Sequence, residues 1–420
     1  MKQKKFLRNV VAAAICLAGM TILTGCPSDD PTAPDSDTTT PTATEAIELT
    51  SPITANTTLK DLGLPVDYIY RGGLLSVENN AVLTIDPGVT IQFTDNSGRG
   101  GITITSGATI KAIGTAAKRI QFIGAYEATG TWAGIEVRSN TDNQFAFCDF
   151  LNAGSFAGAN SGSFYLFNAK AGFSHCKFTN GLGTGIYAGC DAIHYCEFSA
   201  FDNNVFQGYQ NYPPMYLDCY QSLSMLEKLD MTSDFTNNAM KYIEINPDIT
   251  KAVTLSQTTV PYYFSSSIEG LEYTLTINDG VTVYVAGNND FISTGHTQNG
   301  KLMINGTTAK PVKITRLPSS SNYWGGISFE GLKGSVLNNC ILEYGGNISG
   351  AYHGNMIYIT YGSQLTLNNV QLNNAQAYGV YINACAGEYV LTHSNVTFSG
   401  NGEGNVDIWC EGDHLVSDLP

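Results

Sequence analysis

The chain has few charged side chains. Only 14% of its 420 residues are Asp, Glu, Lys or Arg, and acidic residues outnumber basic ones by 36 to 21. A formal net charge of −15 argues against nucleic acid as a partner, because phosphate binding needs clustered Lys and Arg. With 44 glycines and much Asn, Ser and Thr, the surface must be polar through neutral side chains, which favours an all-β solenoid over a helical or Rossmann-type enzyme.

Patterns for metal binding are also missing. The ten cysteines include no Cys-x-x-Cys pair, so a zinc site is not expected. The six histidines form no i, i+4 pair of the kind that binds metal on a helix. We therefore expect no metal and no cofactor.

A long apolar run occurs only near the start of the chain, over residues 10–22, after a basic beginning. It has the composition of an export signal and is too short for a transmembrane anchor. The Leu23-Thr-Gly-Cys26 sequence that follows resembles the lipobox of bacterial lipoproteins. This resemblance implies that residues 1–25 are a signal peptide, and that acylation of Cys26 anchors the mature chain in the outer membrane.

Residues 26–47 read as a flexible tether, because Pro, Thr, Ser, Asp and Ala dominate and bury little apolar surface. Within it, Pro27-Ser-Asp-Asp30 resembles the acidic export signal of Bacteroidetes lipoproteins, which implies exposure on the outer face of the outer membrane. A periplasmic face is the alternative. Signal removal would also take away four basic residues and leave the mature chain more acidic.

The chain repeats itself. Leu83-Thr-Ile-Asp-Pro-Gly-Val-Thr-Ile91 recurs 192 residues later as Leu275-Thr-Ile-Asn-Asp-Gly-Val-Thr-Val283, and Trp132-Ala-Gly-Ile135 recurs as Trp324-Gly-Gly-Ile327. Such self-similarity indicates duplication of one structural unit. We predict two tandem copies, the first ending in an interdomain segment: 48–245 and 246–420.

Short segments of alternating apolar and polar residues fill both predicted copies. Val89-Thr-Ile-Gln-Phe93 is one example, and period two predicts strands with one buried face. Comparable strands are predicted at 101–105, 119–123, 364–367 and 394–398, and a short helix near 223–229. Many short strands with turn signals fit a sandwich, a barrel or a solenoid.

A recurring motif favours the solenoid. Phe147-Cys-Asp-Phe150, His175-Cys-Lys-Phe178 and Tyr195-Cys-Glu-Phe198 place one cysteine every 28 and 20 residues, as stacked coils require. The chain resembles right-handed parallel β-helix proteins of the pectate-lyase-like fold, particularly the Leu-Thr-Ile-x-x-Gly and Trp-x-Gly-Ile repeats of Bacteroidetes surface proteins. The resemblance implies a fold and no particular activity.

If the motif cysteines point inward, their neighbours point outward. In-register coils would then stack Asp149, Lys177 and Glu197 into a charged ladder beside an aromatic column of Phe147, His175 and Tyr195. At the matching places the second copy has Asn339, Asn369 and Asn395 with Ile341, Gln371 and Thr397. Two interpretations stay open: a solvated ladder of little energetic weight, or a ligand face on which aromatic rings and charges hold sugars.

The remaining cysteines and aromatic residues allow further predictions. We interpret Cys148, Cys176, Cys196 and Cys340 as small core residues. A disulfide in each copy, Cys190 with Cys219 and Cys385 with Cys410, is compatible with the spacing and stays open. Trp132 and Trp324 are expected to pack at coil corners, 140–142 to form a turn, and Tyr209, Tyr212 and Tyr216 to form a cap, with a ligand surface as the alternative.

The functional expectation is a non-catalytic, adhesin-like surface lipoprotein that binds glycan or another macromolecule. The alternative is a polysaccharide lyase or glycoside hydrolase acting through the first-copy face, with Lys177 as a base. A polygalacturonase-like site would also need Asp-Asp, Gly-His-Gly and Arg-x-Lys elements, which the folded region lacks. A purely structural role is the third option.

Overall fold

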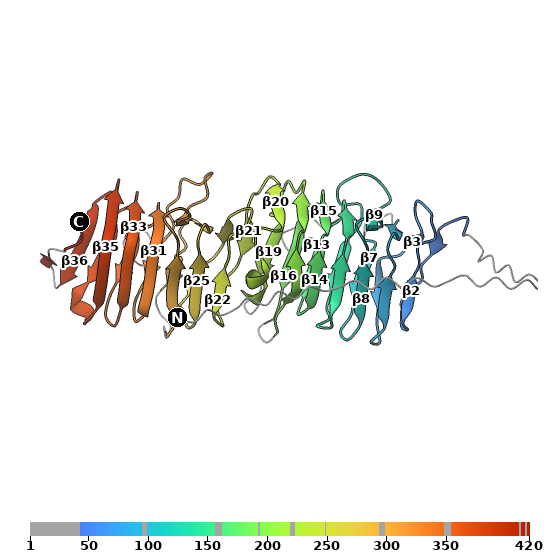
Figure 1. Cartoon of the computed structure of the whole chain (residues 1–420), viewed down its shortest axis with the longest axis horizontal. Helices are drawn as coiled ribbons and strands as arrows, with labels where there is room; N and C mark the ends of the chain where they lie inside the picture. Colours follow the sequence, from blue (N-terminus) through green and yellow to red (C-terminus); the bar gives the residue numbers. More distant parts are fainter. Residues whose placement is uncertain are drawn as a thin grey trace, which may run out of the picture. The chain divides into compact units, whose positions relative to one another are not determined.

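The structure is a computed structural model that describes residues 43–94, 99–155, 162–191, 194–218, 223–247, 249–293, 299–347, 354–410, 413–415 and 418–420. Residues 43–420 form one compact unit. This unit is a parallel β-solenoid of about 12 turns, which confirms the predicted fold class (Figure 1). The predicted signal peptide, Cys26 and most of the predicted tether lie outside the described residues. No helix in the described part is long and apolar enough to cross a membrane.

Three sheets run along the N-terminal part of the solenoid. Sheet A contains β1 (Ile47–Glu48), β3 (Tyr68–Tyr70), β6 (Thr90–Phe93), β9 (Ile120–Gly124), β12 (Cys148–Leu151), β15 (Lys177–Thr179), β18 (Val205–Gln207) and β20 (Asp234–Asn237). Sheet C contains β2 (Thr57–Leu59), β5 (Val82–Ile85), β8 (Thr109–Ile113), β11 (Asn143–Ala146), β14 (Lys170–Ser174) and β17 (Glu197–Asp202).

Sheet B is the third and continues into the C-terminal part. It begins with β4 (Leu74–Val77), β7 (Gly101–Ile104), β10 (Gly134–Val137), β13 (Gly162–Phe167), β16 (Thr184–Gly189), β19 (Met215–Asp218) and β21 (Ile243–Ile245). It goes on with β23 (Tyr262–Phe264), β26 (Thr282–Val285), β29 (Val312–Thr315), β31 (Lys333–Glu343), β33 (Gln364–Asn373) and β35 (Val390–Ser399), and β31 also pairs with the row β28 (Lys301–Asn305), β25 (Thr274–Asn278) and β22 (Val253–Leu255).

Sheet D covers the remaining side of the C-terminal part. It contains β24 (Ile268–Glu269), β27 (Ile292–Ser293), β30 (Ile327–Ser328), β32 (Ile357–Ile359), β34 (Tyr378–Asn383), β36 (Gly404–Cys410) and β37 (Asp413–Leu415). Strand β37 pairs antiparallel with β36. A short helix, η2, spans Ala384–Ala386.

The set of sheets changes near residue 250, because sheets A and C end before it and sheet D begins after it. Sheet B runs through this region because Ile243 of β21 pairs with Tyr262 of β23. The predicted short helix is confirmed as η1 (Leu223–Lys228), which contacts both β17 and β22. The helix therefore lies where another strand would otherwise continue the row of sheet C.

Alternation of side chains explains the core. In β9, Ile120 and Phe122 are buried and Gln121 is exposed, as period two requires. Inside the solenoid, phenylalanines from successive coils stack face to face, and the Phe178 ring lies 4.9 Å from Phe150 and 4.4 Å from Phe206. Each ring buries a large apolar area in this stack.

The predicted core residues are confirmed. Cys148, Cys176, Cys196 and Cys340 are all buried. Trp132 and Trp324 are fully buried, so neither is a sugar platform. Tyr209 is also buried and its hydroxyl bonds Ser163 Oγ at 2.8 Å, which confirms packing for this residue.

The duplication stays a prediction, as does its boundary at residue 245, but residues 192 positions apart make equivalent contacts. Trp132 Nε1 donates to the Leu151 carbonyl and Trp324 Nε1 to the Glu343 carbonyl, each at 2.7 Å. The backbone hydrogen bonds between Thr115 and Lys118 recur between Thr307 and Lys310. Similar sequence is therefore matched by similar local geometry.

One predicted disulfide lies fully within the described residues. Cys385 and Cys410 are bonded, with their Cα atoms 4.7 Å apart, so η2 is fastened to β36. Cys190 is disulfide-bonded too, but Cys219, its predicted partner, lies outside the described residues.

Candidate functional site

The predicted first-copy face exists in part. Asp149 and Lys177 are paired neighbours on β12 and β15, and the rings of Phe147 and His175 stack at 4.5 Å between centroids. Arg119 joins this group: its Nε donates to Asp149 Oδ1 at 2.8 Å, and its guanidinium lies 5.8 Å from the Phe147 ring centroid. The group is therefore a compact, internally paired cluster.

The third member of the predicted ladder was wrong. Lys177 pairs next with Val205, whereas Glu197 lies on β17 in sheet C, opposite Lys170. The Glu197 carboxylate forms a salt bridge with Lys170 at 3.1 Å. The physical reason is the length of the chain between the motifs. The 28 residues from Cys148 to Cys176 complete one coil and return to sheet A, whereas the 20 residues from Cys176 to Cys196 reach only sheet C, which comes before sheet A in the next coil.

Like Glu197, Tyr195 lies away from its predicted position, which was in the aromatic column. It is 56% exposed and lines a hollow of about 640 Å³ beside η1. The other lining residues are Glu197, Phe198, Ser224, Glu227, Lys228, Thr250 and Lys251. The six predicted face residues are therefore divided between two places in the solenoid.

His175 contacts a serine and an aspartate, but without the order of a catalytic triad. Ser174 Oγ lies 2.9 Å from His175 Nδ1 and donates to Asp202 Oδ2 at 2.9 Å. Because the serine proton goes to the carboxylate, the histidine is not placed as its base. This arrangement indicates structure and not nucleophilic catalysis.

The matching positions in the C-terminal part do form the predicted ladder. Ile341 pairs with Gln371, and Gln371 pairs with Thr397. Asn395 Nδ2 donates to Asn369 Oδ1 at 2.8 Å. With Asn339 these residues line a shallow hollow of about 220 Å³, which offers amides and threonine hydroxyls but no aromatic ring.

A longer outward row, not predicted from the sequence, runs along sheet B. Strand register aligns one outward residue from each of seven successive coils: Glu136, Tyr165, Tyr187, Tyr216, Glu244, Tyr263 and Tyr284. We call its five tyrosines the tyrosine column. Each lies between two buried residues of its strand; Tyr165, Tyr216, Tyr263 and Tyr284 are half-buried and point away from the core, whereas Tyr187 is itself buried, 5% exposed.

The rings of the first three members of the tyrosine column contact one another. Tyr165 and Tyr187 stack at 5.3 Å with nearly parallel planes, whereas Tyr187 and Tyr216 meet at 5.5 Å and 67°. Tyr242 packs beside Tyr263 at 4.9 Å and 53°. Parallel rings present only their edges to solvent. The tilted rings near Tyr216 and Tyr263 interrupt the stack, so apolar ring surface and phenol hydroxyls lie side by side at these two positions.

Carboxylates flank the tyrosine column. Glu136 forms a salt bridge with Arg138, with 2.7 Å between Glu136 Oε1 and Arg138 Nη2. Asp218 accepts from the Tyr187 hydroxyl at 2.9 Å and from Asn246 Nδ2 at 2.8 Å. Burial, and then the charge of Asp218, raise the pKa of Glu244, although a hydrogen bond with Ser265 opposes this. The centre of the row is therefore acidic.

The tyrosine hydroxyls keep their protons at physiological pH. Burial raises the pKa of Tyr216 and of Tyr242 to about 12 in each case. A neutral phenol both donates and accepts, as a sugar hydroxyl does. The row thus presents apolar edges with polar tips at fixed intervals.

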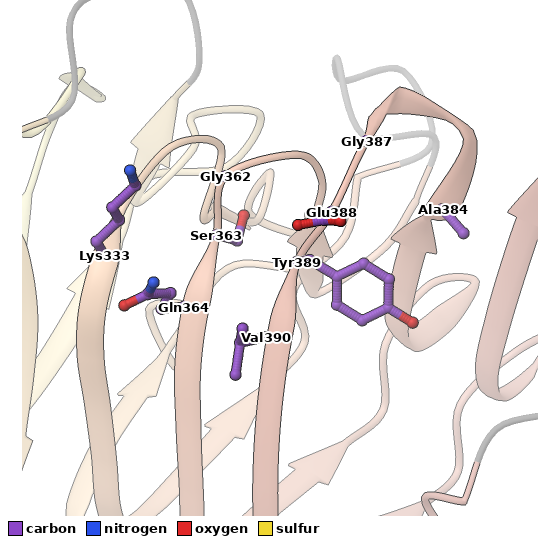
Figure 2. A pocket seen from close by; sticks show the side chains of 9 residues that line it. All are labelled: Lys333, Gly362, Ser363, Gln364, Ala384, Gly387, Glu388, Tyr389 and Val390. Atoms are coloured by element: carbon purple, nitrogen blue, oxygen red, sulfur yellow. The ribbon is translucent and has the colours of Figure 1, made fainter.

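Another hollow, of about 650 Å³, lies near the C-terminus between the starts of β31, β33 and β35 and the segment after η2. Figure 2 shows Lys333 and Gln364 on one side of it, and Glu388 and Tyr389 on the other. Among the described residues, no group of three His, Cys, Asp or Glu side chains could hold a metal ion.

Among the described residues, Asp290 is a carboxyl with a strongly raised pKa. Its Oδ1 is buried without a hydrogen-bond partner among the described residues, and burial, with the charge of Glu269, raises its pKa to about 7. The folded state thus binds a proton that the unfolded chain releases near pH 4. Stability should fall as pH rises from about 4 to 7, and stay level above that range.

We expect Asp290→Asn to remove this pH dependence and to stabilise the protein by about 2 kcal/mol at pH 7.5, less than the full shift implies because the side chain is partly solvated. Urea unfolding of both proteins at pH 5.0 and 7.5 measures the effect. Equal pH dependence of the two proteins would show that Asp290 titrates normally.

A pattern for the tyrosine column is present in the sequence. Each member is the centre of an apolar-Tyr-apolar triplet, as in Phe164-Tyr-Leu166 or Val283-Tyr-Val285. The intervals between the tyrosines range from 21 to 47 residues, so no simple period links them. Only the strand register brings them into one row.

Comparisons with known proteins provide no relative. No protein-family model matches the chain, and no curated protein and no solved structure matches it. The fold and the surfaces described above are therefore the basis for a proposed function.

Proposed function

We propose that this protein is a non-catalytic, adhesin-like surface lipoprotein whose solenoid binds glycan chains. The observation that carries the proposal is the tyrosine column, with five outward tyrosines in register on sheet B. Tyrosine gives a large, rigid contact area with a hydroxyl at its tip. An extended polymer lying along the row could contact several rings at once.

The charges near the column favour a neutral glycan. Within the described part of the chain, no salt bridge involves Asp218 or Glu244. These two carboxylates lie between the coils of Arg138 and Lys313, whose cations are already paired with Glu136 and Glu343. A polyuronate or sulfated chain would be repelled there, whereas carboxylates accept hydrogen bonds from sugar hydroxyls.

The cellular location is part of the proposal. Acylation at Cys26 would attach the chain to the outer membrane, and residues 26–47 would hold the solenoid away from the bilayer. The Pro27-Ser-Asp-Asp30 sequence supports placement on the cell exterior, where glycans are accessible.

An enzyme acting through Arg119, Asp149, His175 and Lys177 is the second candidate. Two basic groups beside one carboxylate are among the elements that a polysaccharide lyase uses. However, Arg119 already binds Asp149 and the carbonyl of His175 at 2.8 Å, which leaves Lys177 as the base. This candidate predicts that Lys177→Ala abolishes product formation.

Polysaccharide retention and cleavage distinguish the candidates. Purified residues 43–420 are passed over immobilised neutral, uronic and sulfated polysaccharides, and the eluate is assayed for new reducing or unsaturated ends. We expect retention on a neutral polysaccharide without release of ends. Release that Lys177→Ala eliminates would replace the binding proposal with the enzyme, and absence of both retention and release would contradict both.

A further inference from the structure

We infer that the hollow lined by Lys333, Gln364, Glu388 and Tyr389 is a second carbohydrate site, which binds one neutral sugar unit. It is remote in sequence from the tyrosine column and shares no residue with it. The inference therefore holds or fails independently of the proposed glycan chain on sheet B.

One wall of the hollow is fixed at several points. The Gly362 amide donates to the Glu388 carbonyl at 2.7 Å, and the Val390 amide donates to the Ser363 carbonyl at 2.8 Å. The Cys385–Cys410 disulfide fastens the preceding helix η2 to β36. A wall held on both sides loses little conformational entropy on binding.

Gly387 shows how closely this wall is packed. Its φ is 137°, and a Cβ there would lie 2.9 Å from Tyr361 Cβ. A side chain would therefore both strain the backbone and push the segment away from Tyr361. The glycine at position 387 therefore allows the close packing that gives the hollow its shape.

The polar groups around the hollow have no partners of their own. Among the described residues, the side chains of Lys333, Gln364 and Glu388 make no hydrogen bond or salt bridge. Other charged residues at comparable places are paired in some cases, as Lys118 is with Asp61 and Lys313 is with Glu343. Register places Lys333, Gln364 and Val390 on three successive coils, so the two donors, Lys333 and Gln364, lie side by side next to an apolar residue.

These groups match the chemistry of a neutral sugar. Lys333 and Gln364 donate to hydroxyl oxygens, Glu388 accepts from hydroxyl protons, and the Tyr389 ring offers an apolar surface. One ammonium and one carboxylate cancel in charge, so an ionised sugar gains no net attraction. About 650 Å³ is the size of pocket that holds a small molecule, so one sugar unit fits.

The test uses purified protein with intact disulfides and the methyl glycosides of glucose, galactose, N-acetylglucosamine and glucuronic acid as probes. Saturation-transfer NMR and titration calorimetry measure binding. We expect millimolar or tighter binding of at least one neutral glycoside, weakened at least tenfold by Glu388→Gln and by Tyr389→Ala. The double variant Cys385→Ser, Cys410→Ser should weaken it as well, because the wall is released.

Glu127→Gln, an exposed carboxyl outside the hollow, is the matched control and should leave binding unchanged. Circular dichroism of each variant confirms folding, and Glu388 is exposed, so Glu388→Gln tests the site without loss of core contacts. The inference is overturned if no neutral glycoside binds, if Glu388→Gln binds as the parent does, or if only the glucuronide binds.

Discussion

Replacement of Phe178 by alanine is expected to lower the free energy of unfolding by about 4 kcal/mol, because a fully buried ring is removed and its cavity is only partly refilled. The Phe178 ring lies between Phe150 and Phe206 and also meets Phe173 edge-on at 5.8 Å. Each coil of a solenoid is stabilised mainly by its neighbours, so the loss should spread to the adjacent coils.

Urea unfolding, followed by circular dichroism, measures this effect. Hydrogen exchange should show the largest loss of protection in β12, β15 and β18. Phe147→Ala is the matched control, because Phe147 lies at an outer corner and is only partly buried, and we expect it to cost about 1 kcal/mol. A loss below 1 kcal/mol for Phe178→Ala would contradict the interpretation of the phenylalanine stack as the centre of the core.

The double variant Tyr216→Ala, Tyr263→Ala is expected to weaken binding of a neutral polysaccharide about 100-fold. Half-buried aromatic anchors such as these contribute about 1–2 kcal/mol each, and every 1.4 kcal/mol is tenfold in affinity. Both residues lie at the tilted positions of the tyrosine column, on either side of Glu244. Removal of both should therefore interrupt the row at its centre.

Affinity electrophoresis in gels that contain the polysaccharide measures this change. Tyr126→Ala and Tyr273→Ala are the controls, since these tyrosines are 73% and 43% exposed and lie outside the column. Tyr216→Phe with Tyr263→Phe keeps the rings and removes only the hydroxyls, so it should lie between the parent and the alanine variant. Equal losses in the control and column variants would mean that the column is not the binding surface.

The sequence was sufficient for the fold because the fold depends on local alternation. A one-residue error in a strand would turn every side chain to the wrong face, so inward Cys148 and outward Asp149 follow directly from period two. The burial of Trp132 and Trp324 follows in the same way from their repeated context.

Predictions failed where they needed the length of a coil. The motif predicts Glu197 in the ladder of Asp149 and Lys177, but the chain between Cys176 and Cys196 covers only part of a coil. The tyrosine column was missed for the same reason, because uneven loops hide a regular register. The hollow near Tyr389 depends on a disulfide and a glycine turn, which set a shape that composition does not encode.

Footprinting of the bound protein tests the central claim most directly. Residues 43–420 are labelled with hydroxyl radicals with and without a retained neutral polysaccharide, and mass spectrometry locates the protected side chains. The account predicts protection of Tyr165, Tyr216, Tyr263 and Tyr284 on sheet B. Protection confined to Phe147, His175 and Lys177, or none at all, would contradict it.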